Sequence, residues 1–169
     1  DWRQIGLGLF GLADMHIKLG LKYGSPESLK LCDGIGFFMI NRALRASAEL
    51  AREHGTYPRY DANAVLSSPF LKANADESTL SAIRLYGLRN SQLLTIPPSG
   101  TISTMLGVSS GVEPIFANSY TRKTESVHGK DVYYKVYTPS IAALMKERGI
   151  TEEGELPDFC VTAGTLDHK

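Results

Sequence analysis

The sequence has little cysteine, no net charge and no long apolar run, and each absence excludes a class of protein. Cys32 and Cys160 lie far apart in no Cys-x-x-Cys or Cys/His pattern, which excludes a structural zinc site and a disulfide framework and favours a reducing compartment. The 18 basic residues balance 18 acidic ones, which argues against a general nucleic-acid binder. Because neither a signal peptide nor a membrane span is recognisable, we expect a soluble, cytoplasmic protein that contacts neither membrane nor nucleic acid directly.

What the sequence does contain is a series of helix boundaries. Ser25, Pro26 and Glu27 supply an N-cap, a proline at the first helical position and an early acid, and Gly55 follows a basic last turn, so a long helix is predicted between them. Apolar residues at helical spacing predict another helix over about 2–19, despite its glycines. Further helices are predicted over about 77–86, over 103–106 and from Ser140 to Gly149.

Strand signals complete an α/β pattern. Residues 91–96 are the best candidate for a buried parallel strand, because they form an apolar run that follows a predicted helix. Two later runs, 115–121 and 132–137, predict a strand excursion at about 115–137. The chain has the length of one domain and shows no repeat or linker, so we expect residues 1–169 to form a single unit.

The run Gly6-Leu7-Gly8-Leu9-Phe10-Gly11 matches the Gly-x-Gly-x-x-Gly fingerprint of dinucleotide-binding turns. Only five residues precede it, which is too few for the buried strand that the fingerprint requires. No predicted strand ending in an acidic residue follows about 20 residues later. Dinucleotide binding is therefore not expected there, and close helix packing through small residues explains the glycines better.

The residues with the clearest chemistry are Pro98, Ser99, Gly100, Thr101 and Ile102, which we call the phosphate loop. They follow the predicted strand and open a helix, where free N–H groups and the helix dipole favour an anion. The proline removes a donor and stops the strand, the glycine lets the backbone approach a ligand closely, and the two hydroxyls add donors. Taken alone, the pattern fits both a phosphate site and an ordinary loop with an N-cap.

Three ordered segments provide the context: 87–91 (Gly-Leu-Arg-Asn-Ser), 98–103 (Pro-Ser-Gly-Thr-Ile-Ser) and 108–114 (Val-Ser-Ser-Gly-Val-Glu-Pro). Together they resemble the large catalytic subunit of ribonucleotide reductase, over roughly residues 2–120. The resemblance implies an α/β fold, a ten-stranded α/β barrel of which this chain is part of the second half. It also implies that the phosphate loop binds the phosphates of a ribonucleoside di- or triphosphate, an enzyme substrate in deoxyribonucleotide synthesis for DNA replication.

The phosphate loop and the following serine-rich segment are most similar to the adenosylcobalamin-dependent (class II) branch of that family. The resemblance therefore implies adenosylcobalamin, a ribonucleotide substrate, a thioredoxin-like reductant and a homodimer for the full-length enzyme. The radical cysteine and the thiols that reduce the substrate are expected outside this chain, so no catalytic residue and no metal ligand is assigned here, and the fragment should be inactive alone. Two alternatives stay open: an iron-dependent (class I) large subunit, and a phosphate-binding module without catalysis.

Overall fold

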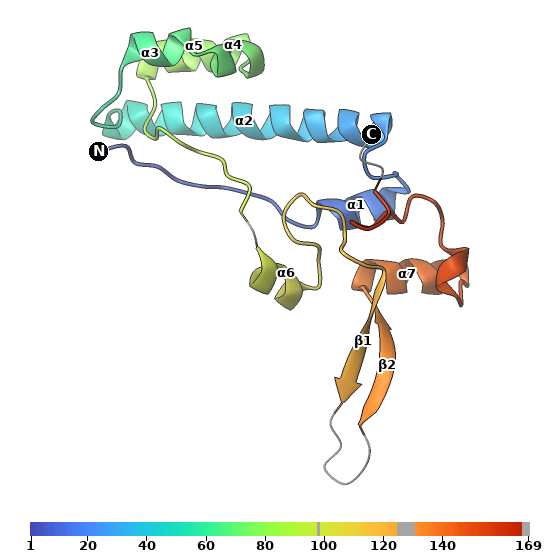
Figure 1. The fold of residues 1–169 in the computed structure, drawn as a ribbon. Coiled ribbons are helices and arrows are strands. Elements are labelled where there is room, and N and C mark those ends of the chain that lie inside the picture. Colours follow the sequence, from blue (N-terminus) through green and yellow to red (C-terminus); the bar gives the residue numbers. More distant parts are fainter. Residues whose placement is uncertain (98, 125–130, 167–169) are drawn as a thin grey trace. The chain divides into compact units, whose positions relative to one another are not determined.

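The computed structural model describes residues 1–97, 99–124 and 131–166, and Figure 1 draws its helices and strands. Contacts within the chain divide it into two compact units, which are described separately here: a first unit of Asp1–Gly8 and Lys30–Ile96, and a second unit of Leu9–Leu29 and Pro97–Lys169. In chain order the elements are α1 (Leu12–Leu19), α2 (Pro26–His54), α3 (Ala62–Ser67), α4 (Pro69–Asn74), α5 (Glu77–Tyr86), α6 (Gly100–Leu106), β1 (Ser119–Thr124), β2 (Val132–Tyr137), α7 (Pro139–Arg148) and the 3₁₀ turn η1 (Glu153–Glu155).

The long helix predicted between Ser25 and Gly55 is confirmed as α2. At its start, the N–H of Ser28 donates to Ser25 Oγ at 3.2 Å. At its end, Gly55 has a φ of 76°, a left-handed conformation that glycine adopts without strain. Both boundaries are therefore set by contacts within a few residues of each helix end.

The core of the first unit is an apolar cluster contributed by α2, by the helices α3 to α5 and by the segment that follows them. Each large side chain buried there stabilises the fold by roughly 1.5–3 kcal/mol. The buried members of the cluster are Ile40, Leu44, Ala48, Tyr57, Leu71, Ile83, Leu88 and Leu93.

Helix α5 has the bounds predicted from the sequence, and Asp76 is its N-cap. The Asp76 carboxylate accepts hydrogen bonds from Thr79 N at 2.7 Å and from Ser78 Oγ at 2.8 Å, and its second oxygen lies 3.4 Å from Arg45 Nη2. These interactions, led by the backbone N–H of Thr79, lower the pKa of Asp76 from 3.8 to about 2. The ionised carboxylate is therefore the form that the fold stabilises.

This shift predicts a pH dependence that an Asp76→Asn variant lacks. Because the pKa of Asp76 is depressed in the folded state, its contribution is complete above pH 3.8 and is lost as the pH falls toward 2. We expect the melting temperature of the full-length wild type to exceed that of the variant near neutral pH, and the gap to narrow between about pH 4 and about pH 2.5. A gap that stays constant across this range contradicts the assignment.

The Gly-Leu-Arg-Asn-Ser segment, which follows α5, forms hydrogen bonds with α2 and with the backbone of Arg3. Arg89 Nη1 donates to the carbonyl of His54 at 2.6 Å, at the end of α2 where carbonyl groups lack helical partners. The side chain of Asn90 accepts from Ser47 Oγ at 3.1 Å and donates to the Arg3 carbonyl at 2.9 Å. This segment, one of the three that carry the family resemblance, thus has a structural role in the first unit.

Residues 2–11 are not helical, so the predicted helix over 2–19 is wrong in its first half and α1 begins only at Leu12. The segment pairs in parallel with 92–95: Leu7 bridges Leu94, with Leu7 N to Leu93 O at 2.9 Å and Thr95 N to Leu7 O at 3.0 Å. Each helical glycine costs about 1 kcal/mol relative to alanine, and Gly11 has a φ of 81° outside the helical region. Partners across the chain therefore satisfy this backbone better than a helix does.

The predicted strand over 91–96 is correspondingly reduced in the structure to an extended segment with one parallel bridge at Leu94. The bridge between Leu7 and Leu94 is parallel, as predicted for this segment. Among the described residues, the backbone of this segment pairs only with the segment around Leu7, and the pairing is limited to one bridge.

The second unit is built around an apolar cluster that joins α1 and α7. Its buried members are Ala13, Ile17, Ile115, Ile141, Leu144, Met145 and Cys160. Strands β1 and β2 form an antiparallel hairpin, with Ser119 opposite Tyr137 and Thr124 opposite Val132. The predicted strand at 132–137 is confirmed, whereas its partner begins later than predicted because Ile115 is buried in a separate bridge with Thr162.

Two helix starts in the second unit differ from the sequence prediction by a turn or less. Helix α7 begins at Pro139 after the N-cap residue Thr138, and Ser140 is buried in its first turn instead of capping it. Helix α6 begins at Gly100, so it includes most of the phosphate loop and not only 103–106. Among the helices of the described residues, none is both long enough and apolar enough to cross a membrane.

Candidate functional site

The structure places the phosphate loop at the start of α6, in the second unit. Pro98 lies outside the described residues. Ser99 is the N-cap residue, with φ −139° and ψ 35°, and Gly100, Thr101 and Ile102 form the first turn of the helix. The first turn is exposed, whereas Ser99 is half-buried. The sequence prediction that a helix opens within this loop is therefore confirmed.

The exposed first turn carries backbone donors. The first helical hydrogen bond runs from Ser103 N to Ser99 O at 2.9 Å. Among the described residues, no acceptor is found for the N–H groups of Gly100, Thr101 and Ile102. A Cβ added at Gly100 would meet no described atom within 4 Å apart from its chain neighbours and its own helix, so the side-chain position of this residue is open.

A second loop, residues 108–112, lies against the phosphate loop, and we call it the serine loop. The N–H of Ser99 donates to Ser110 Oγ at 3.3 Å, and in return Ser99 Oγ accepts from Gly111 N at 3.1 Å. The two hydroxyl oxygens lie 3.5 Å apart. Either hydroxyl can donate to the other across this distance, so Ser99 and Ser110 form one local hydrogen-bonded group.

The hydroxyls of α6 divide into two groups. Ser103 Oγ donates to the Gly100 carbonyl at 3.0 Å, and Thr104 Oγ1 donates to the same carbonyl at 2.7 Å. Both hydroxyl protons are thus used within the helix. Thr101 is exposed in the first turn, and the described chain offers its hydroxyl no hydrogen-bond partner. Of the two hydroxyls predicted to bind phosphate, that of Thr101 has no partner among the described residues. That of Ser99 contacts Gly111 N and Ser110 Oγ.

The serine loop forms hydrogen bonds with the start of α1 and with Tyr23, which follows that helix. Asp14 Oδ2 accepts from Ser109 N at 2.5 Å, and Gly11 N donates to the Ser109 carbonyl at 2.8 Å. Tyr23 donates from its hydroxyl to the Val112 carbonyl at 2.5 Å. Sequence reasoning missed these supports. The one local signal was an acidic residue, Asp14, on the apolar face of a predicted helix, where a buried carboxylate requires a partner.

The cysteines have the environment of structural thiols. Burial raises the pKa of both the Cys32 and Cys160 thiols, which lowers the fraction of reactive thiolate. Neither forms a disulfide. Within the described residues there is also no group of His, Cys, Asp or Glu side chains arranged to hold a metal ion. The absence of an assigned catalytic residue or metal ligand in this chain stays a prediction.

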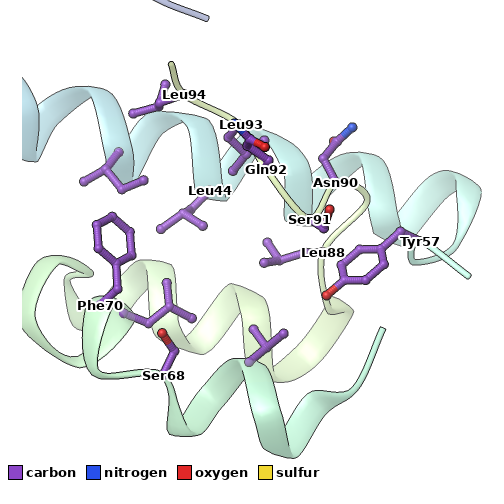
Figure 2. A pocket seen from close by; sticks show the side chains of 13 residues that line it. Leu44, Tyr57, Ser68, Phe70, Leu88, Asn90, Ser91, Gln92, Leu93 and Leu94 are labelled. Carbon is purple, nitrogen blue, oxygen red and sulfur yellow. The ribbon is translucent and has the colours of Figure 1, made fainter. Parts of the chain in front are cut away.

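The first unit contains a cavity of about 390 Å³ that Figure 2 shows from close by. Its walls come from α2 and from the region around Ser68 and Phe70, and residues 90–94 close one side. No charged side chain lines it, and the Asn90 amide is already engaged by Ser47 and Arg3. The lining is mostly apolar, and its other polar side chains include those of Ser68, Ser91 and Gln92.

A family model described as the ribonucleotide reductase barrel domain matches residues 1–159. A vitamin B12-dependent ribonucleoside-diphosphate reductase of Thermoplasma acidophilum is 38% identical over 166 residues, which cover 98% of this chain and 19% of that protein. The ribonucleoside-diphosphate reductase subunit alpha of Chlamydia muridarum is 30% identical and is covered to 17%, with 97% of this chain aligned. The chain thus spans about a fifth of the length of these relatives.

The fold is similar to that of a solved reductase. The alpha subunit of the Actinobacillus ureae class Id ribonucleotide reductase superimposes on 90% of this chain with a TM-score of 0.57 and 23% sequence identity, over 22% of that subunit. The likeness confirms the partial α/β barrel expected from the sequence.

Proposed function

Because this chain belongs to the family of the ribonucleotide reductase barrel domain, we propose that its full-length protein reduces ribonucleotides to 2′-deoxyribonucleotides. The substrate that we propose is a ribonucleoside diphosphate, since the similar proteins of T. acidophilum and C. muridarum are named for that substrate. The part played by this chain is to bind the substrate phosphates. The chemistry at the ribose belongs to residues elsewhere in the protein.

The observation that supports phosphate binding is the pair of hydrogen bonds that Ser99 forms with Ser110 and Gly111, at the start of the first turn of α6. We propose that the Ser99 hydroxyl and the N–H groups of the first turn of α6 bind one anion together. Charge-assisted hydrogen bonds of this kind are about twice as strong as neutral ones, and the helix dipole adds about 0.3–1 kcal/mol. Several such bonds hold a diphosphate without a lysine.

We assign adenosylcobalamin to the full-length protein on the basis of the class II resemblance and of the T. acidophilum relative, whose name gives vitamin B12 dependence. When bound, this cofactor would supply the radical that the family resemblance assigns to a cysteine. Among the described residues, no group of three or more His, Cys, Asp or Glu side chains is arranged to hold a metal ion, and no residue is given a role in holding the cofactor. What this chain's residues do is fix the phosphates and thereby the ribose.

The direct test is an assay of the purified full-length protein with CDP, a dithiol reductant and adenosylcobalamin, and without a second subunit. We expect dCDP to form as the dithiol is oxidised to a disulfide. Activity only with an iron-loaded second subunit would establish the class I alternative. Nucleotide binding with no reduction under either condition would leave a phosphate-binding module and contradict reductase function.

The remaining partners follow from the same proposal. A thioredoxin-like protein is the proposed reductant, and a homodimer is the proposed assembly of the full-length enzyme. The cytoplasm is the proposed location, in keeping with two cysteines that form no disulfide. Sedimentation of the full-length protein tests the dimer, because a monomer at micromolar concentration contradicts it.

A further inference from the structure

The buried carboxylate of Asp14 has an unusual partner. Asp14 is the third residue of α1 and is only 6% exposed. An acid at this position ordinarily accepts from the free N–H groups of its own helix. Here Asp14 Oδ2 instead accepts from the N–H of Ser109, a residue far along the chain, at 2.5 Å.

The start of α1 fixes both backbone polar groups of Ser109. Its N–H is held by Asp14, and its carbonyl accepts from Gly11 N at 2.8 Å. A Cβ added at Gly11 would come within 3.5 Å of Val108, so helix and loop are in close contact as well as hydrogen-bonded. Ser109 is therefore an anchored point of the serine loop.

The anchored residue is next in sequence to those that contact the phosphate loop. Ser110 accepts from Ser99 N through its hydroxyl, and Gly111 donates to Ser99 Oγ. Because only one or two residues separate Ser109 from these contacts, we expect a displacement of Ser109 to disturb both of them. The path from Asp14 to Ser99 thus consists of one charged hydrogen bond, a short run of backbone and two further hydrogen bonds.

We propose that Asp14 is a positioning residue for substrate binding, which acts through Ser109 and the serine loop to hold the Ser99 hydroxyl toward the substrate phosphate. This inference rests on the proposed function of the phosphate loop and adds a residue that touches neither substrate nor cofactor. The role requires a hydrogen-bond acceptor at a fixed distance from Ser109. It does not require the negative charge itself.

The test compares Asp14→Ala and Asp14→Asn in the full-length enzyme. Asp14→Ala removes the acceptor, and because loss of the Ser99 hydrogen bond to a charged phosphate corresponds to about 10- to 100-fold in affinity, we expect KM for the ribonucleotide to rise by up to about that factor. The kcat should change little, since the phosphates bind equally in the ground and transition states. Asp14→Asn keeps an acceptor oxygen at the same distance, so it should restore KM to within about threefold of wild type.

A matched control removes another buried hydrogen bond from the second unit. Ser28 is 1% exposed and donates to the Ser25 carbonyl at 2.9 Å, so Ser28→Ala should lower the melting temperature without raising KM. If Asp14→Ala behaves like this control, with unchanged KM, the positioning role is overturned. If Asp14→Ala yields no soluble protein, Asp14→Glu is measured in its place, because glutamate keeps the charge but moves the acceptor by one methylene. A raised KM for Asp14→Glu supports the proposal, and an unchanged KM overturns it.

The outcome also separates this inference from the function on which it rests. A wild-type enzyme that does not reduce ribonucleotides removes the proposed function. An active wild type in which Ser99→Ala raises KM but Asp14→Ala does not leaves the phosphate loop intact and removes only the role of Asp14.

Discussion

Replacing Ser99 with alanine in the full-length enzyme is expected to raise KM for the ribonucleotide by about 10- to 100-fold. A hydrogen bond to a charged group contributes about 1.5–3 kcal/mol, and about 1.4 kcal/mol corresponds to a factor of ten in affinity. The variant also loses the acceptor for Gly111 N, so the serine loop is released on one side. Initial-rate kinetics over a range of substrate concentration measure the effect.

The control for this prediction lies on the same helix. Thr104→Val removes a hydroxyl that donates to the Gly100 carbonyl at 2.7 Å and is therefore unavailable to a ligand. We expect this variant to keep the wild-type KM. Equal values of KM for Ser99→Ala and wild type would remove the phosphate-binding role of the loop, whereas a rise in both variants would point to a loss of helix integrity.

The largest effect on stability is expected for Gly87→Ala. Gly87, at the end of α5, has φ 72° and ψ −156°, a region open essentially to glycine alone, and strain of this kind costs about 1–3 kcal/mol. A Cβ there would lie 2.5 Å from Thr56 Cγ2 and 3.0 Å from Tyr60 Cε1. Such overpacking costs about 1–3 kcal/mol more. We expect a total loss of about 2–6 kcal/mol, measured by urea unfolding of the full-length protein.

Gly55→Ala separates the two contributions. Gly55 also has a positive φ, 76°, but an added Cβ would meet no described atom within 4 Å. Only the left-handed backbone is then penalised, at about 1–2 kcal/mol. If the two variants lose equal stability, the contacts of Thr56 and Tyr60 with the Gly87 position are not tight, and the packing assigned to this turn is wrong.

The three segments that carry the family resemblance have different physical roles. Residues 87–91 anchor the first unit through Arg89 and Asn90. Within the second unit, Gly100, Thr101 and Ile102 form the first turn of α6, and Ser110 and Gly111 contact Ser99. One segment therefore contributes contacts that stabilise the fold of the first unit, and the other two contribute contacts within the candidate site.

The phosphate loop could be predicted from the sequence because its signals lie in adjacent residues. The turn at Ser99 and Gly100 follows a proline, and a glycine with hydroxyl neighbours indicates a helix start that can bind an anion. Asp14 was not accessible, since its partner Ser109 is distant in sequence and a backbone N–H leaves no trace in residue type. A carboxylate on an apolar helical face was the only hint.

The sequence by itself determined the elements whose ends are capped within a few residues, above all α2 with Ser25 and Gly55, and α5 with Asp76. Only the tertiary structure decided that residues 2–11 are not helical, since the parallel pairing of Leu7 with Leu94 gives this backbone hydrogen-bond partners that are distant in sequence. It likewise decided which side chain supports the serine loop. The physical reason is the same in both cases: a cap is satisfied by its own neighbours, whereas a parallel pair or a buried carboxylate is satisfied by groups that the chain brings close only on folding.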